Sequence, residues 1–304
     1  MTDTVIVIVT YNSASEIGSC LEATLRSGAS ILVVDNASTD HTCEVVSRFP
    51  VNLIRNERNL GFAGAVNQAI RQSTQDIIVL LNPDAALKTD VEAFVQSFGE
   101  ARIGACGGLL VDVDGSPQSG FTLRRLPSLT TLIFEVMGIN RILPENPVNW
   151  HYRCKGINLL CSQEAEQPAG ALLAVRREAW IDLEGFDETF WPAWFEDVDF
   201  CKRLRDRGWR IRYEPAVIAV HSGGHSVGSL KDSLKADYWY GNLFRYTRKH
   251  WGVSSCRVVS FAILLGSVPR AVVGIFRERR IRPILVYLGL AGQCARSVFT
   301  GRWG

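Results

Sequence analysis

The feature that most constrains the fold is a regular alternation of short apolar runs with longer mixed stretches over the first 111 residues. Four runs are almost continuously apolar, at residues 5–9, 31–34, 51–54 and 77–81. Such strands are typical of a parallel sheet that helices cover on both faces, because neither face meets water. Helices are expected between them, at residues 14–26, 39–49 and 61–73. These repeated strand–helix–strand units predict an α/β protein with a doubly wound, mostly parallel sheet.

Composition agrees with an ordinary globular enzyme, since 47% of the 304 residues are hydrophobic and 21% are charged. The net charge is only +2, which argues against the basic field of a nucleic-acid-binding protein, so no nucleic-acid partner is expected. The eight cysteines form no C-x-x-C pair, and neither a zinc knuckle nor a dithiol redox site is indicated. No basic-then-apolar leader precedes the first strand, which favours a cytoplasmic location.

The organisation changes along the chain. From about residue 112 to residue 167 the periodicity weakens, and four prolines interrupt any long element. Order returns over residues 168–220, and residues 232–250 have a helical, aromatic-rich pattern. We therefore predict a main domain at residues 1–230 and a helical extension at residues 231–304.

Polar clusters follow all four apolar strands. They are Thr10-Tyr11-Asn12, Asp35-Asn36 with the four residues after it, residues 56–59, and Asn82-Pro83-Asp84. Ser38, Thr39 and Asp40 in the second cluster are expected mainly to cap a helix. Four clusters at one edge of a parallel sheet predict a binding crevice. Asp35 directly follows a buried strand, where its carboxylate can accept a hydrogen bond from a pyrimidine N3–H or a ribose hydroxyl.

Two other nucleotide folds are disfavoured. A dinucleotide-binding domain would have a G-x-G-x-x-G turn after its first strand, but Val9 runs into Thr10-Tyr11-Asn12-Ser13. The pair Gly61 and Gly64 follows the third strand and lacks the preceding glycine. A Walker-type phosphate loop is also absent from the sequence.

Asp84 and His221 are candidate metal ligands. Asp84 follows a proline that ends its strand, and a carboxylate there suits Mg²⁺ or Mn²⁺ holding a diphosphate. A plain N-P-D turn is the alternative. His221 follows the apolar run at residues 217–220 and precedes a glycine-rich segment in which His225 is a weaker candidate.

Asp197 is the candidate general base. Asp199 has Lys202 and Arg203 at helical spacing, which predicts a surface ion pair, whereas Asp197 shares its face with apolar residues. Burial raises the pKa of a carboxyl toward the range of a working base. Three neighbours are candidate acceptor contacts: Trp191, Trp194 and Glu196. The two tryptophans can equally belong to the core.

Seven motifs, taken in order, resemble those of the family 2 glycosyltransferases. They are V-T-Y-N, V-D-N-A-S-T-D, N-L-G-F-A-G-A-V-N, L-L-N-P-D, G-A-L-L-A-V-R-R, G-F-D-E…F-E-D-V-D and H-S-G-G-H-S. The resemblance spans roughly residues 3–230 and is strongest to the bacterial rhamnosyltransferase-like branch. It implies a GT-A fold with nucleotide-binding and acceptor halves, and an inverting transfer by direct displacement that a divalent cation, Mg²⁺ or Mn²⁺, assists.

The resemblance also implies roles for single residues. Asp84 matches the last acid of the family's metal motif, His221 matches a histidine that can join the metal, and Asp197 matches the base. Asn82 stands where the first acid of that motif is usual, which weakens the expectation of strict metal dependence. The nucleotide-binding set carried over by position is Thr10, Tyr11, Asn12, Asp35, Asn36, Asn59, Gly61, Asn67 and Asn82.

The C-terminal extension contains apolar runs at residues 258–276 and 284–292, with arginines between them. Pro269-Arg270 interrupts the first run, which argues against a spanning helix. An apolar stretch flanked by arginines favours a peripheral contact of residues 258–292 with anionic lipid, and a pair of core helices is the alternative. The protein is then expected at the cytoplasmic face of the inner membrane.

The expected function is transfer of a sugar from a nucleotide-sugar donor to a hydroxyl of a glycan or lipid-linked acceptor in cell-surface polysaccharide synthesis. By resemblance the first choice of donor is dTDP-rhamnose, and UDP- and GDP-sugars stay open. A nucleotidyltransferase would need a glycine- and lysine-rich loop where Thr10 to Ser13 stand. A non-catalytic nucleotide-sugar-binding protein is the third possibility, because of Asn82. The oligomeric state has no signature in the sequence.

Overall fold

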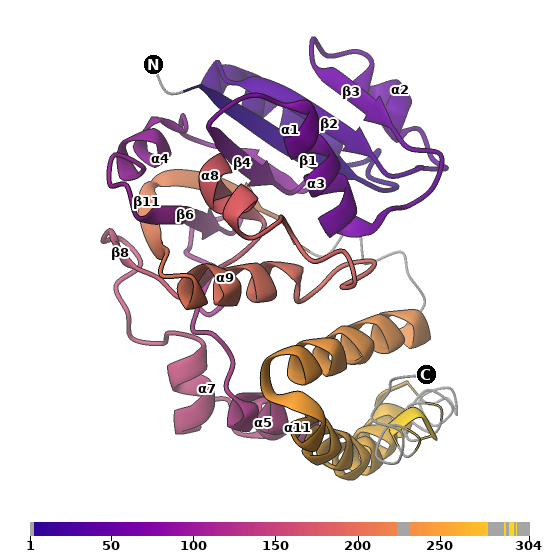
Figure 1. Cartoon of the computed structure of the whole chain (residues 1–304). Helices are drawn as coiled ribbons and strands as arrows, with labels where there is room; N and C mark the ends of the chain where they lie inside the picture. Colours follow the sequence, from indigo (N-terminus) through magenta and orange to yellow (C-terminus); the bar gives the residue numbers. More distant parts are fainter. Residues whose placement is uncertain (1–2, 224–231, 279–288, 290–291, 295, 297–304) are drawn as a thin grey trace. The chain divides into compact units, whose positions relative to one another are not determined.

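The computed structural model describes residues 3–223, 232–278, 289, 292–294 and 296, and the chain divides into two compact units. The first unit comprises residues 1–126 and 153–229. The second comprises residues 127–152 and 230–304, so a segment from the middle of the chain groups with the C-terminal helix. Each unit is treated separately below, and Figure 1 labels its elements.

The first unit contains a nine-stranded sheet, with eight strands in the order β3-β2-β1-β4-β10-β6-β11-β5 and β8 paired to β11. Strands β1 to β4 are parallel to one another. Strand β10 is antiparallel to both β4 and β6, β11 is parallel to β6, and β5 is antiparallel to β11. The strands are β1 (Thr4–Thr10), β2 (Ser30–Asp35), β3 (Asn52–Arg55), β4 (Ile77–Leu81), β5 (Ala85–Leu87), β6 (Ile103–Val111), β8 (Gln163–Glu164), β10 (Leu172–Arg176) and β11 (Arg210–His221). The predicted α/β fold is confirmed, but the sheet is mixed: it is parallel from β3 to β4, and four of its eight strand pairings are antiparallel.

Helices cover both faces of this sheet, and the side chains of β1 alternate between the two resulting cores. Ile6 and Ile8 pack in one cluster with residues of α1 (Ile17–Thr24), α2 (Thr42–Val46) and α4 (Glu92–Ser97). Val5 and Val7 pack in the other with residues of α3 (Gly61–Gln72), α8 (Arg177–Asp182) and α9 (Glu196–Asp206). Successive side chains of a strand point to opposite faces, so a strand buried on both sides must be apolar throughout.

The first two helices, α1 and α2, are shorter than predicted, because polar side chains fix the turns at their beginnings. Residues 14–16 form a turn in which Ala14 N donates to Asp40 Oδ2 and Ser13 N donates to Thr42 Oγ1, so α1 begins only at Ile17. A short 3-10 helix, η1 (Leu25–Ser27), extends its end. Asp40 also accepts from the backbone N–H of Thr42 at the start of α2, as a capping residue does.

A two-stranded sheet completes the first unit beside the main sheet. Strand β7 (Leu123–Arg124) is antiparallel to β9 (Gln167–Pro168), and Arg124 lies opposite Gln167. These two residue pairs lie in the segment where the sequence periodicity is weak. The pairing brings the chain after residue 120 next to the residues that precede β10.

The second unit is helical. It contains α5 (Leu129–Met137), α6 (Ile139–Ile142), α7 (Pro147–Tyr152) and α11 (Asp232–Glu278), which is broken at Gly252 with φ of 78°. Helix α11 packs closely on α5, since a Cβ at Gly266 would collide with the backbone of Val136 and Met137. The predicted helix at residues 232–250 is therefore present.

Within the described residues, no helix is long and apolar enough to cross a bilayer. The side chains of Pro269, Arg270 and Arg277, and all of residues 279–288, lie outside the described part, as does His225. The membrane contact proposed for residues 258–292 can therefore be considered only on the side chains up to residue 267 and the few described beyond residue 288.

Candidate active site

The first unit changes its winding direction between β1 and β4. The chain runs from β1 outward to β2 and β3, then returns to the other side of β1 as β4. In open α/β sheets, ligands bind in the crevice at the carboxyl ends of strands next to such a reversal. Thr10 at the end of β1 lies directly opposite Asp35 at the end of β2, and Asn82 follows the end of β4. Three of the four predicted polar clusters thus follow three neighbouring strands.

Asp35 is a buried carboxylate with an exposed fraction of 2%, and hydrogen bonds compensate its charge. Thr10 Oγ1 donates to Asp35 Oδ1 at 2.9 Å, Ser38 N donates to Asp35 Oδ2 at 3.0 Å, and the Ser38 hydroxyl donates to Oδ1. Ser38 also accepts from the backbone N–H of Asn12, whose side chain accepts from Thr39 N. Ser38 and Thr39 were predicted as helix caps, and this is wrong: they join the loops after β1 and β2.

The side chains of Asn36 and Asn59 shape the loop that leads into α3. Asn36, with an exposed fraction of 2%, donates to the backbone oxygen of Gly61 at 3.0 Å. Asn59 Oδ1 accepts from Gly61 N at 2.7 Å. Gly61 has φ of 77°, and a Cβ there would lie 2.8 Å from Trp191 Cδ1. Only glycine fits this position, both for its backbone and for its contact with the tryptophan.

Asn67 joins the two halves of the first unit. Its amide nitrogen donates to Phe186 O at 2.8 Å and to Glu188 Oε1 at 2.9 Å, and its oxygen accepts from Trp180 Nε1 and Phe186 N. Both donors and both acceptor positions of the amide are therefore used. No hydrogen-bonding capacity of the amide is then left for a ligand, and the predicted nucleotide contact of Asn67 stays a prediction.

Asp84 and His221 lie side by side although 137 residues separate them in the sequence. His221 Nε2 is 3.4 Å from Asp84 Oδ1, and both side chains have an exposed fraction of 5%. Strand β11 ends at His221 and pairs with β5, which begins directly after Asp84, so His221 faces Ala85 in the register. The backbone N–H of Ser222 also donates to Asp84 O at 3.2 Å.

Gln118 determines which nitrogen of His221 carries a proton. Gln118 Nε2 donates to Asp112 Oδ1 and to His221 O, both at 2.7 Å, so its other atom is the acceptor oxygen. That oxygen lies 3.1 Å from His221 Nδ1, which must then donate. In the neutral ring the lone pair is consequently on Nε2, directed at the carboxylate of Asp84. Two electron-rich atoms at this separation attract a cation between or beside them.

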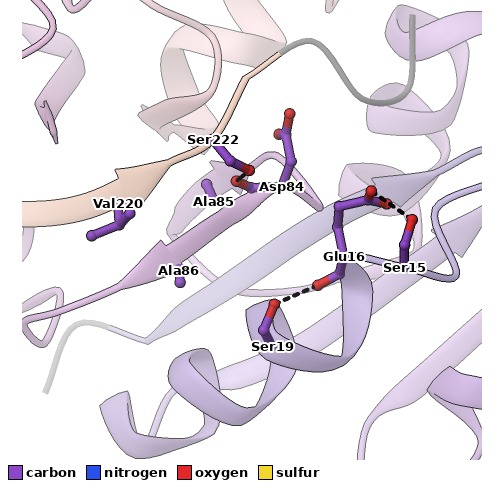
Figure 2. Close-up of a pocket in the computed structure, with 8 residues that line it drawn as sticks. All are labelled: Ser15, Glu16, Ser19, Asp84, Ala85, Ala86, Val220 and Ser222. Atoms are coloured by element: carbon purple, nitrogen blue, oxygen red, sulfur yellow. Dashed lines mark hydrogen bonds between the residues drawn. The ribbon is translucent and has the colours of Figure 1, made fainter. Parts of the chain in front are cut away.

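A cavity of about 310 Å³ opens beside Asp84. Figure 2 shows Asp84 and Ser222 on one wall, and Glu16 with its hydroxyl neighbours Ser15 and Ser19 on the other. Small side chains of β5 form its floor. Among the described residues no group of three or more histidine, cysteine or acidic side chains has the spacing to hold a metal alone. Asp84 and His221 can supply two protein ligands, and a cation there would need oxygens from substrate and water, which is how Mg²⁺ is usually held.

Asp197 lies in the first turn of α9, where backbone N–H groups surround its carboxylate. Val198 N donates to Oδ1 at 2.8 Å, Gly170 N donates to Oδ2 at 3.1 Å, and Gln167 Nε2 lies 3.3 Å from Oδ2. Burial raises the pKa of Asp197, and the two backbone donors and the charge of Arg124 oppose that rise. Burial raises the pKa of Glu196 well above its usual range, and the neighbouring charge of Asp197 raises it further. Of the two carboxyls, Asp197 therefore loses its proton more readily, and only a deprotonated carboxylate can act as a base.

Asp199 forms the predicted ion pair, but it is not at the surface. Its exposed fraction is 0%, and Arg203 Nε donates to its Oδ2 at 2.7 Å. Arg203 also donates to the backbone oxygens of Leu183 and Gly185. The helical spacing predicted the ion pair. Its burial could not be predicted, because the backbone oxygens that Arg203 also contacts belong to the loop of residues 183–185, which lies outside α9.

The segment before α9 has an unusual backbone. Trp194 and Phe195 have φ of 76° and 73°, a region that non-glycine residues rarely adopt and that concentrates at functional sites. Trp191 has an exposed fraction of 42%, and its Nε1 donates to Asn59 O at 3.2 Å. The predicted acceptor residues Trp191, Trp194 and Glu196 thus belong to a constrained segment that ends at Asp197. At Trp191 this segment contacts the loop before α3.

Family models agree with this arrangement. The model described as glycosyl transferase family 2 matches residues 5–157, and one described as the N-terminal domain of galactosyltransferase matches residues 151–221. The chain belongs to glycosyl transferase family 2. The two matched regions together contain Thr10, Asp35, Asp84, Asp197 and His221.

Among the relatives of this family 2 glycosyltransferase is the N-acetylglucosaminyl-diphospho-decaprenol L-rhamnosyltransferase of Mycobacterium tuberculosis, 32% identical over 75% of this chain and 79% of that protein. The rhamnosyltransferase WbbL of Escherichia coli is 28% identical over 60% of this chain and 65% of its own. The predicted resemblance to the rhamnosyltransferase-like branch is confirmed.

Solved structures show the same fold. A mannosyltransferase from Pyrobaculum calidifontis, in complex with GDP-Man and Mn²⁺, has a TM-score of 0.56 at 16% identity and covers 98% of this chain and 87% of that one. Glucosyl-3-phosphoglycerate synthase from Mycobacterium tuberculosis, in complex with Mn²⁺, UDP and phosphoglyceric acid, has a TM-score of 0.50 at 14% identity, over 84% and 78% of the two chains. The predicted GT-A fold is confirmed.

Proposed function

We propose that this glycosyltransferase moves a sugar from a nucleotide-sugar donor to an acceptor hydroxyl in one inverting displacement, with Asp197 as the general base. The observation that carries the proposal is the position of Asp197. It is the carboxylate held by Gly170 N and Val198 N at the start of α9, and its pKa is raised by burial. A base of this kind can take a hydroxyl proton while its own geometry stays fixed.

In the proposed reaction, the acceptor oxygen attacks the anomeric carbon and the bond from that carbon to the diphosphate oxygen breaks. The acceptor proton moves to the carboxylate of Asp197, and the electron pair of the broken bond leaves with the nucleoside diphosphate. A single displacement inverts the anomeric centre. A second displacement would need a protein nucleophile and an acid beside the sugar, as in retaining glycosidases, and the sequence indicates no such pair.

Asp84 and His221 would hold a divalent cation, Mg²⁺ or Mn²⁺. His221 Nε2 lies 3.4 Å from Asp84 Oδ1 and fits such a group, because both atoms can donate an electron pair to a cation and Gln118 keeps the ring oriented. When bound, the cation would neutralise the leaving diphosphate. Asn82, in place of an acid, leaves the site with less negative charge and predicts weaker metal binding than a two-acid motif gives.

Thr10, Tyr11 and Asp35 would line the nucleotide site. The hydrogen bonds from Thr10 and Ser38 fix the carboxylate of Asp35 at the ends of β1 and β2. Asn12, Asn36, Asn59 and Gly61 would act mainly by shaping the loops that surround this site.

The names of the relatives support rhamnose from dTDP-rhamnose as the sugar and donor, with a glycan or lipid-linked acceptor in cell-surface polysaccharide synthesis. A lipid-linked acceptor would bring the protein to the cytoplasmic face of the membrane. The test is a panel of dTDP-, UDP- and GDP-sugars with Mg²⁺, Mn²⁺ or EDTA and an N-acetylglucosaminyl diphosphate lipid. Acceptor-dependent release of dTDP from dTDP-rhamnose, with a product of inverted anomeric configuration, is expected. Release with no panel member would contradict the proposal and would favour a nucleotide-sugar-binding protein.

A further inference from the structure

Arg124 is an arginine near the general base with no carboxylate partner among the described residues. It lies on β7, opposite Gln167 of β9, and Gln167 Nε2 is 3.3 Å from Asp197 Oδ2. The charge of Arg124 acts on Asp197 directly, as one of the influences on its titration. A half-buried guanidinium has lost part of its hydration, so an anion that reaches it binds more strongly than at an open surface.

Two contacts orient Arg124, and neither of them uses its terminal nitrogens. Its Nε donates to Gly120 O at 2.9 Å, and its guanidinium carbon lies 5.3 Å from the centre of the Phe121 ring. The Phe121 ring also contacts the candidate metal site, because it stacks on the ring of His221. The two ring centres are 5.2 Å apart and the angle between the ring planes is 6°. Arg124 and His221 are thus neighbours of the same aromatic ring, on the segment that also contains Gln118.

Further positive charge surrounds Arg124. Arg153 Nη1 donates to Gly120 O at 3.3 Å, so two guanidinium groups share one backbone oxygen. Arg125 and Arg205 both pair with the single carboxylate of Glu166, at 2.9 Å and 3.3 Å. Arg124, Arg125, Arg153 and Arg205 form a basic cluster, in which the single carboxylate of Glu166 pairs with two of the four arginines.

Two buried polar atoms next to Asp197 also lack a protein partner. Gln167 Oε1 and Glu196 Oε2 accept and donate no hydrogen bond among the described residues, although the exposed fractions of their side chains are 3% and 7%. Buried polar groups are normally paired, and unpaired ones mark positions that a ligand or water completes. The hydroxyls of a sugar can donate to the glutamine oxygen and can form a hydrogen bond with the carboxyl of Glu196.

We propose that Arg124, assisted by Arg153, binds the phosphate group of a glycosyl-phosphate acceptor, while Gln167 and Glu196 contact its sugar next to Asp197. The inference rests on the proposed function and adds the location and chemistry of the acceptor's anionic group. A guanidinium presents paired N–H donors that match phosphate oxygens. In a glycosyl-phosphate, one sugar ring separates the phosphate from the reacting hydroxyl, and Gln167 likewise stands between Arg124 and Asp197.

The experiment compares two acceptors that share a sugar and differ in charge. One is N-acetylglucosaminyl diphosphate with a short prenyl tail, and the other is the neutral octyl N-acetylglucosaminide. Dissociation constants are measured by calorimetry on the full-length chain without donor, for the wild type, Arg124→Gln and Arg124→Lys. We expect Arg124→Gln to weaken binding of the diphosphate compound at least about tenfold, with the octyl glycoside changed less than about twofold. Arg124→Lys should recover part of the loss, because a point charge remains.

The matched control is Arg102→Gln, which removes an arginine whose guanidinium also lies over an aromatic ring, that of Trp209, at 5.9 Å. It should leave both acceptors unaffected. The inference is overturned if Arg124→Gln weakens both acceptors equally or neither, or if the wild type binds the diphosphate compound no better than the glycoside. It is also overturned if Arg124→Gln weakens dTDP binding as much, since Arg124 would then serve the donor. These binding measurements need no turnover, so loss of the proposed function would be seen separately, as absence of product from the wild type.

Discussion

Gln118 holds His221 in one orientation and one tautomer, and through it arranges the pair that faces a cation. The glutamine lies 103 residues from the histidine, in a loop after a D-G turn, and nothing in its surroundings in the sequence indicates this role. A hydrogen bond of this kind to the other ring nitrogen determines how well a histidine serves as a metal ligand. The candidate metal site is therefore larger than the two residues that the motif comparison identifies.

Replacing Gln118 by leucine should weaken Mn²⁺ binding about tenfold or more, the usual effect of removing such a partner. The measurement is Mn²⁺ titration followed by electron paramagnetic resonance, with dTDP present. The ¹⁵N chemical shifts of His221 should at the same time change from one tautomer to a mixture. Gln163→Leu is the control, because the side-chain amide of Gln163 donates to the backbone oxygens of Asn158 and Cys161 and not to His221. Unchanged Mn²⁺ affinity in Gln118→Leu would contradict this role.

The titration of Asp197 gives a second prediction for a single residue. Its burial raises the pKa from the ordinary value of 3.8, and only the deprotonated carboxylate can accept the hydroxyl proton. Activity should therefore fall as the pH decreases through this raised pKa, so the acidic limb of the kcat profile lies above 3.8. A limb at or below that value would show that another group limits the reaction.

Helix α9 supports the base through a buried ion pair on its opposite face. Asp199→Asn removes the charge that Arg203 faces, and breaking one partner of such a pair should cost about 3 kcal/mol of unfolding free energy. The control is Asp206→Asn on the same helix, which breaks the ion pair with Lys202. That pair is also spaced by four residues, but the side chain of Asp206 is 54% exposed, so its loss should lower the unfolding free energy by less than about 1 kcal/mol. Chemical denaturation of both variants measures the difference. Equal costs would mean that the burial of Asp199 does not matter.

At the scale of elements, the sequence was informative where one physical rule dominates. The strand Ile77–Leu81 and the helix Gly61–Gln72 follow from apolar runs and helical spacing, and the structure has them within a residue of the predicted bounds. The short pairing of Leu123–Arg124 with Gln167–Pro168 could not be predicted, because contacts distant in sequence create it. The same limit applies to Asn67, whose four hydrogen bonds connect α3 to residues more than 110 positions away.

At the scale of the whole chain, residues 127–152 group with the C-terminal helix instead of with their sequence neighbours. Apolar side chains of α5 cause this, since Leu132 and Val136 are buried in the second unit. The proline-interrupted segment looked irregular in the sequence because its short helices depend on tertiary packing: α5 packs on α11, and α6 and α7 pack on α5.

The second unit also carries an exposed apolar stripe on α11, formed by Val258, Phe261 and Leu265 with exposed fractions of 49%, 60% and 50%. We predict that the full-length chain sediments with vesicles containing anionic lipid, and that Phe261→Asp with Leu265→Asp reduces the bound fraction severalfold. The control is Val113→Asp in the first unit, where an isolated valine is 83% exposed. Equal binding of all three proteins would contradict a role of the stripe.

The central claim is that Asp197 removes the acceptor proton during sugar transfer. The most direct measurement is the turnover of Asp197→Asn, which keeps the shape of the side chain, together with calorimetry of dTDP binding to the same protein. We predict that kcat falls at least about a hundredfold, the usual contribution of a general base, while the Kd for dTDP stays within about twofold of the wild type. Turnover close to the wild-type value would contradict the account.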